Sequence, residues 1–273
     1  MNVSTKGRLP PDLHTHNARC GHAQGTILEY ARAAEAAGVA ALACTDHLPT
    51  DDGFGLDSRM PLSEFPEYVA EVERVRGEVA VPVLLGVEAD YYRGCERFLE
   101  QVSGEYGFDV ILGSVHFRDY WSDRPEARGL ADHEDPEGVW RVYFGLVKEM
   151  AQTGLYDVVG HLDLPKKFGM PKEEGMLRSY AEPALDAIAE AGMAIEINTS
   201  GGIHKVREFY PTRWLLTLAF ERGIPLALGS DSHVPSRVGD GFVEAMELAR
   251  GVGYRSAAMY RGRVRSEVRF PEG

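Results

Sequence analysis

Two histidines separated by a single residue, His14 and His16, stand near the start of the chain, and His22 follows them closely. On an extended strand the side chains alternate between two faces, so both imidazoles of the pair point the same way. Imidazoles gathered on one face are ligands for zinc and related metals. Such pairs also occur on solvated strand ends, and a short motif matches many unrelated sequences. The pair therefore indicates a metal site only if the rest of the chain supplies more ligands.

Further histidines and carboxylates follow the other short apolar runs of the sequence. His47 and Glu88 each come shortly after such a run. Asp231 and His233 follow the last run and repeat the one-residue spacing of the first pair. If the runs are parallel strands of a barrel, their carboxyl ends share one face, where such folds place their active sites. The residues predicted to bind metal are His14, His16, His22, His47, Glu88, His116, His161, Asp231 and His233.

This set is larger than one metal ion can use, because zinc-like ions take four or five ligands. Seven of the nine histidines in the sequence belong to it, so the grouping involves most of the histidine in the chain. The number of ligands predicts a cluster of two or three divalent ions, which the carboxylate of Glu88 can bridge. Imidazole and carboxylate ligands suit Zn, Fe or Mn, and the lack of thiolate ligands argues against a purely structural zinc site.

Such a cluster suits the hydrolysis of a phosphate ester, because metal-bound hydroxide forms near neutral pH and the ions hold the charged phosphoryl oxygens. Glu88, as the predicted bridge, belongs to the catalytic machinery, and Asp119 is a candidate for protonating the leaving oxygen. Basic residues after the fifth and sixth apolar runs could contact the phosphate, although charge runs of this kind are often simply solvated. These candidates are Lys166, Lys167, Lys205 and Arg207.

Short apolar runs alternate with longer helical patterns along the chain, which is typical of parallel β/α units. Thr26 and Glu29, for example, have the spacing of a helix capping box. The pattern favours a single closed (β/α) barrel domain over residues 1–273, with a doubly wound open sheet as the alternative. A charged stretch at residues 118–135 is predicted to be an irregular loop near the substrate. The seven predicted strands are residues 11–16, 39–45, 81–87, 108–113, 156–160, 193–198 and 224–229.

The composition excludes several classes of protein. A net charge of −13 over 273 residues lacks the basic character expected of a protein that binds long nucleic acid. No apolar run approaches the ~18 residues of a membrane span, and residues 1–10 lack the apolar segment of a secretory signal. Three cysteines without Cys-x-x-Cys spacing predict a reducing compartment. We therefore expect a soluble, cytoplasmic protein that acts on a small phosphate ester; the sequence does not indicate its oligomeric state.

Seven motifs occur in order between residues 12 and 233: DLHTHNARCGH, CTDH, GVEAD, GSVHF, GHLDLPKKF, EINTSGG and GSDSH. Together they resemble the PHP (polymerase and histidinol phosphatase) family. The CGH, GSVHF and GHLDLPKKF elements resemble its stand-alone histidinol-phosphatase branch. This resemblance implies a distorted seven-stranded (β/α) barrel with a trinuclear metal centre. It also implies hydrolysis of L-histidinol phosphate to L-histidinol and phosphate, a late step of histidine biosynthesis.

The resemblance further implies how the ligands are divided among three ions. One ion would take His14, His16, Glu88 and Asp231. A second would share Glu88 and add His116 and His161. The third would take His22, His47 and His233.

One segment departs from the pattern of that branch. After Asn-Thr-Ser-Gly the branch usually carries Leu-Arg-Lys, whereas this chain has Gly202, Ile203 and His204 there. The phosphate contact expected from this loop, and with it the identity of the ester, stays open at this point. The alternatives are a PHP phosphoesterase for another small ester or for nucleotide ends, and a non-catalytic accessory module, which would lack ligands. The amidohydrolases also begin with His-x-His, but they usually need a bridging lysine on the fourth strand, which here ends in Ser-Val-His.

Overall fold

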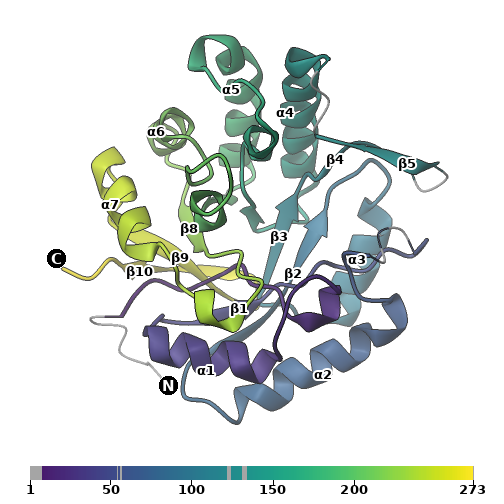
Figure 1. Cartoon of the computed structure of the whole chain (residues 1–273), viewed down its shortest axis with the longest axis vertical. Helices are drawn as coiled ribbons and strands as arrows, with labels where there is room; N and C mark the ends of the chain where they lie inside the picture. The colour runs from purple at the N-terminus through teal and green to yellow at the C-terminus, as the bar shows by residue number, and fades with distance from the viewer. Residues whose placement is uncertain (1–7, 54, 56, 122–123, 131–133, 273) are drawn as a thin grey trace.

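The computed structural model describes residues 8–53, 55, 57–121, 124–130 and 134–272. A curled, parallel six-stranded sheet lies at the centre, and the helices surround it (Figure 1). In sheet order the strands are β1 (Leu42–Cys44), β2 (Val83–Asp90), β3 (Val110–Ser114), β6 (Val158–Val159), β7 (Ala194–Asn198) and β8 (Leu226–Gly229). The strand order follows the sequence without the reversal that a doubly wound sheet contains, so the structure favours the barrel-like alternative.

The helices follow the strands around the outside of this sheet. They are α1 (Ile27–Ala37), α2 (Phe65–Arg76), α3 (Glu96–Glu105), α4 (Pro136–Thr153), α5 (Glu174–Glu190), α6 (Arg213–Glu221) and α7 (Phe242–Val252). The predicted capping box is present at the start of α1, where the side chains and backbone N–H groups of Thr26 and Glu29 bond reciprocally. None of the helices in the described part of the chain combines the length and the apolar character needed to cross a membrane.

Residues 9–16 run between the two edges of the sheet. Asp12 forms a parallel bridge with Leu42 on one side, and Thr15 forms a parallel bridge with Ser232 on the other. The strand predicted at residues 11–16 is therefore not confirmed as a continuous strand. The segment is extended, but it alternates its backbone hydrogen bonds between two neighbours and so forms single bridges rather than a continuous ladder.

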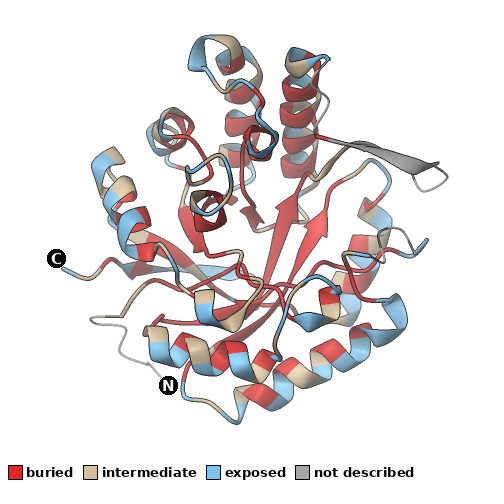
Figure 2. Cartoon of the chain, viewed as in Figure 1, coloured by how far each residue is buried: buried red, intermediate tan, exposed pale blue. Residues whose placement is uncertain are grey.

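All residues of the six central strands are buried, as expected for a parallel sheet covered on both faces (Figure 2). Most apolar side chains pack between the sheet and the helices. A second, smaller cluster fills the inside of the curled sheet with mostly small side chains, because the space enclosed by the strands is narrow. It consists of Leu13, Ala41, Ala43, Leu84, Val110, Leu112, Val158, Ala194, Ala227, Ala258 and Tyr260.

An antiparallel hairpin of β9 (Ser256–Arg261) and β10 (Val264–Arg269) closes one end of this interior. Its Ala258 and Tyr260 belong to the inner cluster, and the Tyr260 hydroxyl donates a hydrogen bond to the carbonyl of Asp157, just before β6. The hairpin therefore covers the amino ends of the strands. The opposite end, where the carboxyl ends of the strands lie, is open for a binding site.

A second hairpin replaces the irregular loop predicted at residues 118–135. It pairs β4 (Phe117–Trp121) with β5 (Arg124–Gly129) and extends away from the barrel (Figure 1). The prediction of an irregular loop was wrong because the charged sequence of this stretch shows no strand pattern. The two strands form by antiparallel backbone pairing with each other, with shifts of register inside the pairing.

Candidate metal centre

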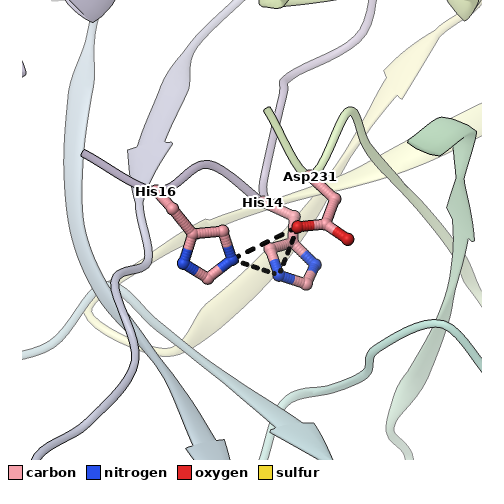
Figure 3. Close-up of side chains that lie close together, drawn as sticks. All are labelled: His14, His16 and Asp231. Carbon is pink, nitrogen blue, oxygen red and sulfur yellow. Dashed lines mark hydrogen bonds and ion pairs between the residues drawn. The ribbon is translucent and has the colours of Figure 1, made fainter. Parts of the chain in front are cut away.

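Four side chains converge where residues 9–16 meet the end of β8; Figure 3 shows three of them, His14, His16 and Asp231. Nε2 of His14 lies 3.0 Å from Nε2 of His16, and Oδ1 of Asp231 lies 3.7 and 3.3 Å from these nitrogens. Oε2 of Glu88, on β2, lies 3.5 and 3.4 Å from the same two atoms. Ligand atoms that are each about 2.0–2.2 Å from a tetrahedral ion lie about 3.3–3.6 Å apart. The two nitrogens therefore lie from each other and from both oxygens at distances close to those between ligands of one ion.

The other oxygen of Glu88 faces a second group of imidazoles. Oε1 lies 3.0 Å from Nε2 of His161 and 3.5 Å from Nε2 of His116. The hydroxyl of Ser114, at the end of β3, donates a hydrogen bond of 2.6 Å to the same oxygen and fixes the plane of the carboxylate. One buried carboxylate thus presents its two oxygens to two separate groups of nitrogen atoms, which is the geometry of a bridging ligand.

A third group lies nearer the surface. Nε2 of His22 lies 2.9 Å from Nε2 of His233. The buried His47 adjoins both this pair and Glu88: its ring stacks 5.5 Å from that of His22, and its Nδ1 lies 2.9 Å from Oε2 of Glu88. Nδ1 of His22 lies 3.0 Å from the carbonyl of Cys20, and Nδ1 of His233 lies 2.9 Å from that of Asp231. Because a carbonyl only accepts, each Nδ1 is the donor and each Nε2 is left with a free lone pair, the form that binds metal.

The two candidate ligand carboxylates, Glu88 and Asp231, are held in the charged form. Burial by itself would raise the pKa of Glu88, but the imidazoles of His47, His14 and His116 lower it well below the ordinary value. The pKa of Asp231 is likewise well below its ordinary value, because His14 and His16 outweigh the effect of burial. Both side chains are therefore anionic at neutral pH, as metal ligands must be.

The histidines respond in opposite directions. Burial and the neighbouring His47 lower the pKa of His16 well below its usual range, so its imidazole is neutral. Burial would also lower the pKa of His14, but Glu196, Glu88 and Asp231 raise it well above that range. A divalent cation bound beside this imidazole would offset the negative charge of the three carboxylates around it. The donor types, their spacing and this charge all fit divalent metal ions.

Two carboxylates that the sequence analysis did not assign lie directly behind these imidazoles. Oε1 of Glu196, at 2.8 Å, accepts a hydrogen bond from Nδ1 of His14, and Oδ1 of Asp90, at 2.6 Å, accepts one from Nδ1 of His116. Carboxylates in this position orient imidazole ligands. A signal was available in the sequence, because Glu196 is a charged residue inside an apolar strand pattern and Asp90 follows Glu88 at the two-residue spacing of one strand face.

A cavity of about 350 Å³ opens over the candidate ligands. Its floor contains all of them except His14, and its walls are largely apolar. Two cationic side chains, Arg59 and Lys167, also line it. An anion bound over the metal positions would therefore meet positive charge, and an adjoining ring or alkyl group would meet an apolar surface. The apolar lining residues are Phe117, Leu130, Leu164, Phe168 and Tyr210.

The four basic residues predicted to contact substrate occupy different environments. Lys167 lines the cavity. Lys166 is buried and points elsewhere: its Nζ donates a 2.6 Å hydrogen bond to the carbonyl of Phe209 and lies 3.0 Å from Oδ2 of Asp163. Lys205 and Arg207 are exposed on the segment after β7 and are not among the described residues that line the cavity. The backbone of Asp119 belongs to β4, but its side chain lies outside the described part of the structure.

Comparison with known proteins identifies the family. The model of the PHP domain matches residues 12–200, which is more than half of the chain. This chain belongs to the PHP family. The family expected from the seven motifs is therefore confirmed, and the match includes the segments that carry His14, Glu88 and His161.

Named relatives cover almost the whole PHP-family chain. A probable histidinol-phosphatase of Deinococcus radiodurans is 44% identical over 248 residues, covering 90% of this chain and 94% of that protein. The histidinol-phosphatase of Bacillus subtilis is 28% identical over 268 residues, covering 86% and 98%. In structure, the histidinol phosphate phosphatase of Lactococcus lactis, solved with zinc, L-histidinol and phosphate, superposes with a TM-score of 0.80 at 22% identity, over 94% of this chain and 98% of that one. This last likeness establishes the shared fold.

Proposed function

We propose that this PHP-family chain is a metal-dependent phosphomonoesterase that hydrolyses L-histidinol phosphate to L-histidinol and phosphate. The observation that carries the proposal is the placement of Glu88, whose two oxygens face two groups of imidazoles at the floor of one cavity. The 44% identity to a probable histidinol-phosphatase over nine-tenths of the chain supports this choice of substrate among phosphate esters.

The metal centre would hold two or three divalent ions, with Zn, Fe and Mn as the candidates. We assign His14, His16, Glu88 and Asp231 to the first ion, and Glu88, His116 and His161 to the second. His22, His47 and His233 would hold the third. When bound, such ions supply Lewis acidity toward the phosphoryl oxygens and lower the pKa of water.

The remaining steps belong to the side chains of this chain. The ammonium of Lys167 would bind a phosphoryl oxygen at the edge of the cavity, with the charge-assisted strength of such contacts. The apolar wall that includes Phe117 and Phe168 would pack against the imidazole ring of histidinol and exclude water from it. Asp119 stays our candidate for protonating the alcohol that leaves.

The other basic candidates take different roles in this proposal. Lys166 does not contact the phosphate in this proposal, because its buried ammonium already bonds to Asp163 and to the Phe209 carbonyl. Lys205 and Arg207 follow β7 on an exposed segment, from which they could contact the substrate at the entrance. They replace the basic residues usual in the histidinol-phosphatase branch, so the substrate assignment depends most on this segment.

We further propose that residues 9–16 act as the seventh strand that closes a single barrel domain. Their bridges to Leu42 and Ser232 link the two edges of the six-stranded sheet. We also propose that the protein works in the cytoplasm, because its three cysteines, Cys20, Cys44 and Cys95, are all free and buried, which suits a reducing compartment.

Steady-state kinetics test the substrate assignment. The metal-loaded protein should show a specificity constant for L-histidinol phosphate well above those for a panel of phosphomonoesters and for a single-stranded oligonucleotide. Equal constants across the small esters would contradict the assignment and favour a general PHP phosphoesterase. Preferential release of nucleotides from the oligonucleotide would favour the nucleotide-end alternative.

A further inference from the structure

Strand β7 and the turn after it present three polar side chains beside the candidate metal centre. Glu196, Asn198 and Ser200 follow one another at two-residue spacing, so the first two lie on one face of the strand and the third continues that row in the turn after it. All three are buried, and Glu196 and Asn198 are at most 1% exposed. None of them belongs to the proposed ligand set, although a buried carboxylate needs partners that offset the cost of burial.

Glu196 finds these partners on two different ligand segments. Its Oε1 accepts a 2.8 Å hydrogen bond from Nδ1 of His14. Its Oε2 accepts a 2.8 Å hydrogen bond from the backbone N–H of His161 and a 3.1 Å bond from the side-chain amide of Asn198. A single carboxylate therefore holds one ligand of the first ion by its ring and one ligand of the second ion by its main chain.

The surrounding backbone is shaped to admit this carboxylate. A Cβ atom at Gly229, at the end of β8, would lie 1.8 Å from Oε1 of Glu196 and 2.6 Å from Cβ of His14. Any side chain at position 229 would thus displace Glu196, His14 or both. The glycine that opens the GSDSH motif is explained by this close approach rather than by the turn after it.

The next two residues of the row fix the ligand from β8. The amide of Asn198 lies 3.3 Å from Oδ2 of Asp231, and the hydroxyl of Ser200 lies 3.1 Å from the same oxygen. The other oxygen, Oδ1, faces the Nε2 atoms of His14 and His16. Donors on one carboxylate oxygen and ligand nitrogens on the other set the direction in which Asp231 points.

We propose that Glu196 is a positioning residue that couples the first and second metal sites. By accepting from Nδ1 of His14, it fixes the imidazole tautomer with the free lone pair on Nε2, directed at the first ion. By accepting from the N–H of His161, it holds the turn that directs Nε2 of that residue at the second ion. The proposal rests on the metal centre assigned above and concerns metal affinity rather than the choice of ester.

The Glu196→Gln variant tests this role, because the amide has nearly the same shape but only one accepting oxygen for the two segments. Metal content after gel filtration and competition with a chromophoric chelator would give the stoichiometry and the dissociation constants. We expect the variant to bind two of the ions 10- to 100-fold more weakly, about the effect of removing a partner behind a metal-bound histidine, and the Co(II)-substituted protein to show an altered visible spectrum. The exposed Glu190→Gln on α5 is the matched control and should behave as the wild type.

Wild-type dissociation constants at every site in Glu196→Gln would overturn the proposal. If that variant does not fold, ¹⁵N NMR of the zinc-loaded wild type replaces it: we expect a protonated Nδ1 on His14, and an unprotonated Nδ1 would overturn the proposal equally. The proposed function fails separately, when the metal-loaded wild type does not turn over L-histidinol phosphate. That result would leave the comparison of metal affinities valid.

Discussion

The guanidinium of Arg59 lies 2.8 Å from Oδ2 of Asp90, and both side chains are buried beside the candidate metal centre. Arg59 also donates a hydrogen bond to the carbonyl of Leu48, while the other oxygen of Asp90 accepts from His116. His116 and Arg59 hold the pKa of Asp90 below its ordinary value against the effect of burial. Asp90 thus connects the guanidinium of Arg59, in the loop before α2, to His116, a predicted metal ligand.

Replacing Arg59 should therefore destabilise the protein strongly. Arg59→Met leaves Asp90 buried without its cation, and breaking one partner of a buried pair costs about 3–5 kcal/mol. Urea unfolding of the metal-free protein, followed by circular dichroism, gives the free energy of unfolding. The double variant Arg59→Met/Asp90→Asn should lose less than the sum of the single variants. Strict additivity would show that the two side chains do not stabilise each other.

Removal of Glu88 should affect more than one metal position. Its Oε2 lies near His14 and His16, and its Oε1 lies near His161, so Glu88→Ala is expected to lose more than one equivalent of metal per chain. Inductively coupled plasma mass spectrometry of the gel-filtered protein measures this. The exposed Glu100→Ala on α3 serves as the control. A loss of one equivalent or less in Glu88→Ala would remove the bridging role.

Substitution of two adjacent lysines should affect different properties of the protein, KM for Lys167 and stability for Lys166. Lys167 lines the cavity, so Lys167→Met should raise KM for the phosphate ester about 10- to 100-fold, the effect of losing a charge-assisted hydrogen bond of about 1.5–3 kcal/mol, with little change in stability. Lys166 pairs with the buried Asp163, so Lys166→Met should cost about 3–5 kcal/mol of stability. Each variant is the control for the other. The reverse assignment of effects would return Lys166 to the substrate site.

The protein should lose stability in alkaline solution. Burial raises the pKa of Cys20 to about 11, and raises the pKa values of Cys44 and Tyr68 above their ordinary 9.0 and 10.0. A group whose pKa is higher in the folded state stabilises the fold fully below its unfolded pKa, and that contribution is lost as the pH rises toward the folded value.

The midpoint of thermal unfolding should therefore fall as the pH is raised from 8.5 to 11. Tyr68→Phe removes one of the groups that resist ionisation, so the decline should be shallower in that variant, although its neutral-pH stability drops because the hydroxyl no longer donates to the carbonyls of Cys44 and Gly86. An unchanged slope in Tyr68→Phe would mean that other groups control the alkaline limb.

Local patterns in the sequence predicted much of the fold. The capping box at Thr26 and Glu29 was predicted from spacing alone and is present, and the runs at residues 39–45, 193–198 and 224–229 contain strands β1, β7 and β8. These features depend on nearest neighbours along the chain, which a sequence displays directly. The stretch at 118–135 was predicted wrongly, because its strands are stabilised by pairing with each other rather than by an apolar periodicity.

Histidines and carboxylates stand at the ends of apolar runs in the sequence, and parallel strands end on one face, so the side chains that could meet were predictable from the sequence. How they meet is visible only in the folded chain. It shows that Glu88 faces two groups of imidazoles, that Lys167 rather than Lys166 lines the cavity, and that Glu196 lies behind His14. These relationships depend on the curl of the sheet and on glycine-sized gaps such as that at Gly229. They join residues far apart in the chain, and no spacing along the sequence encodes those distances.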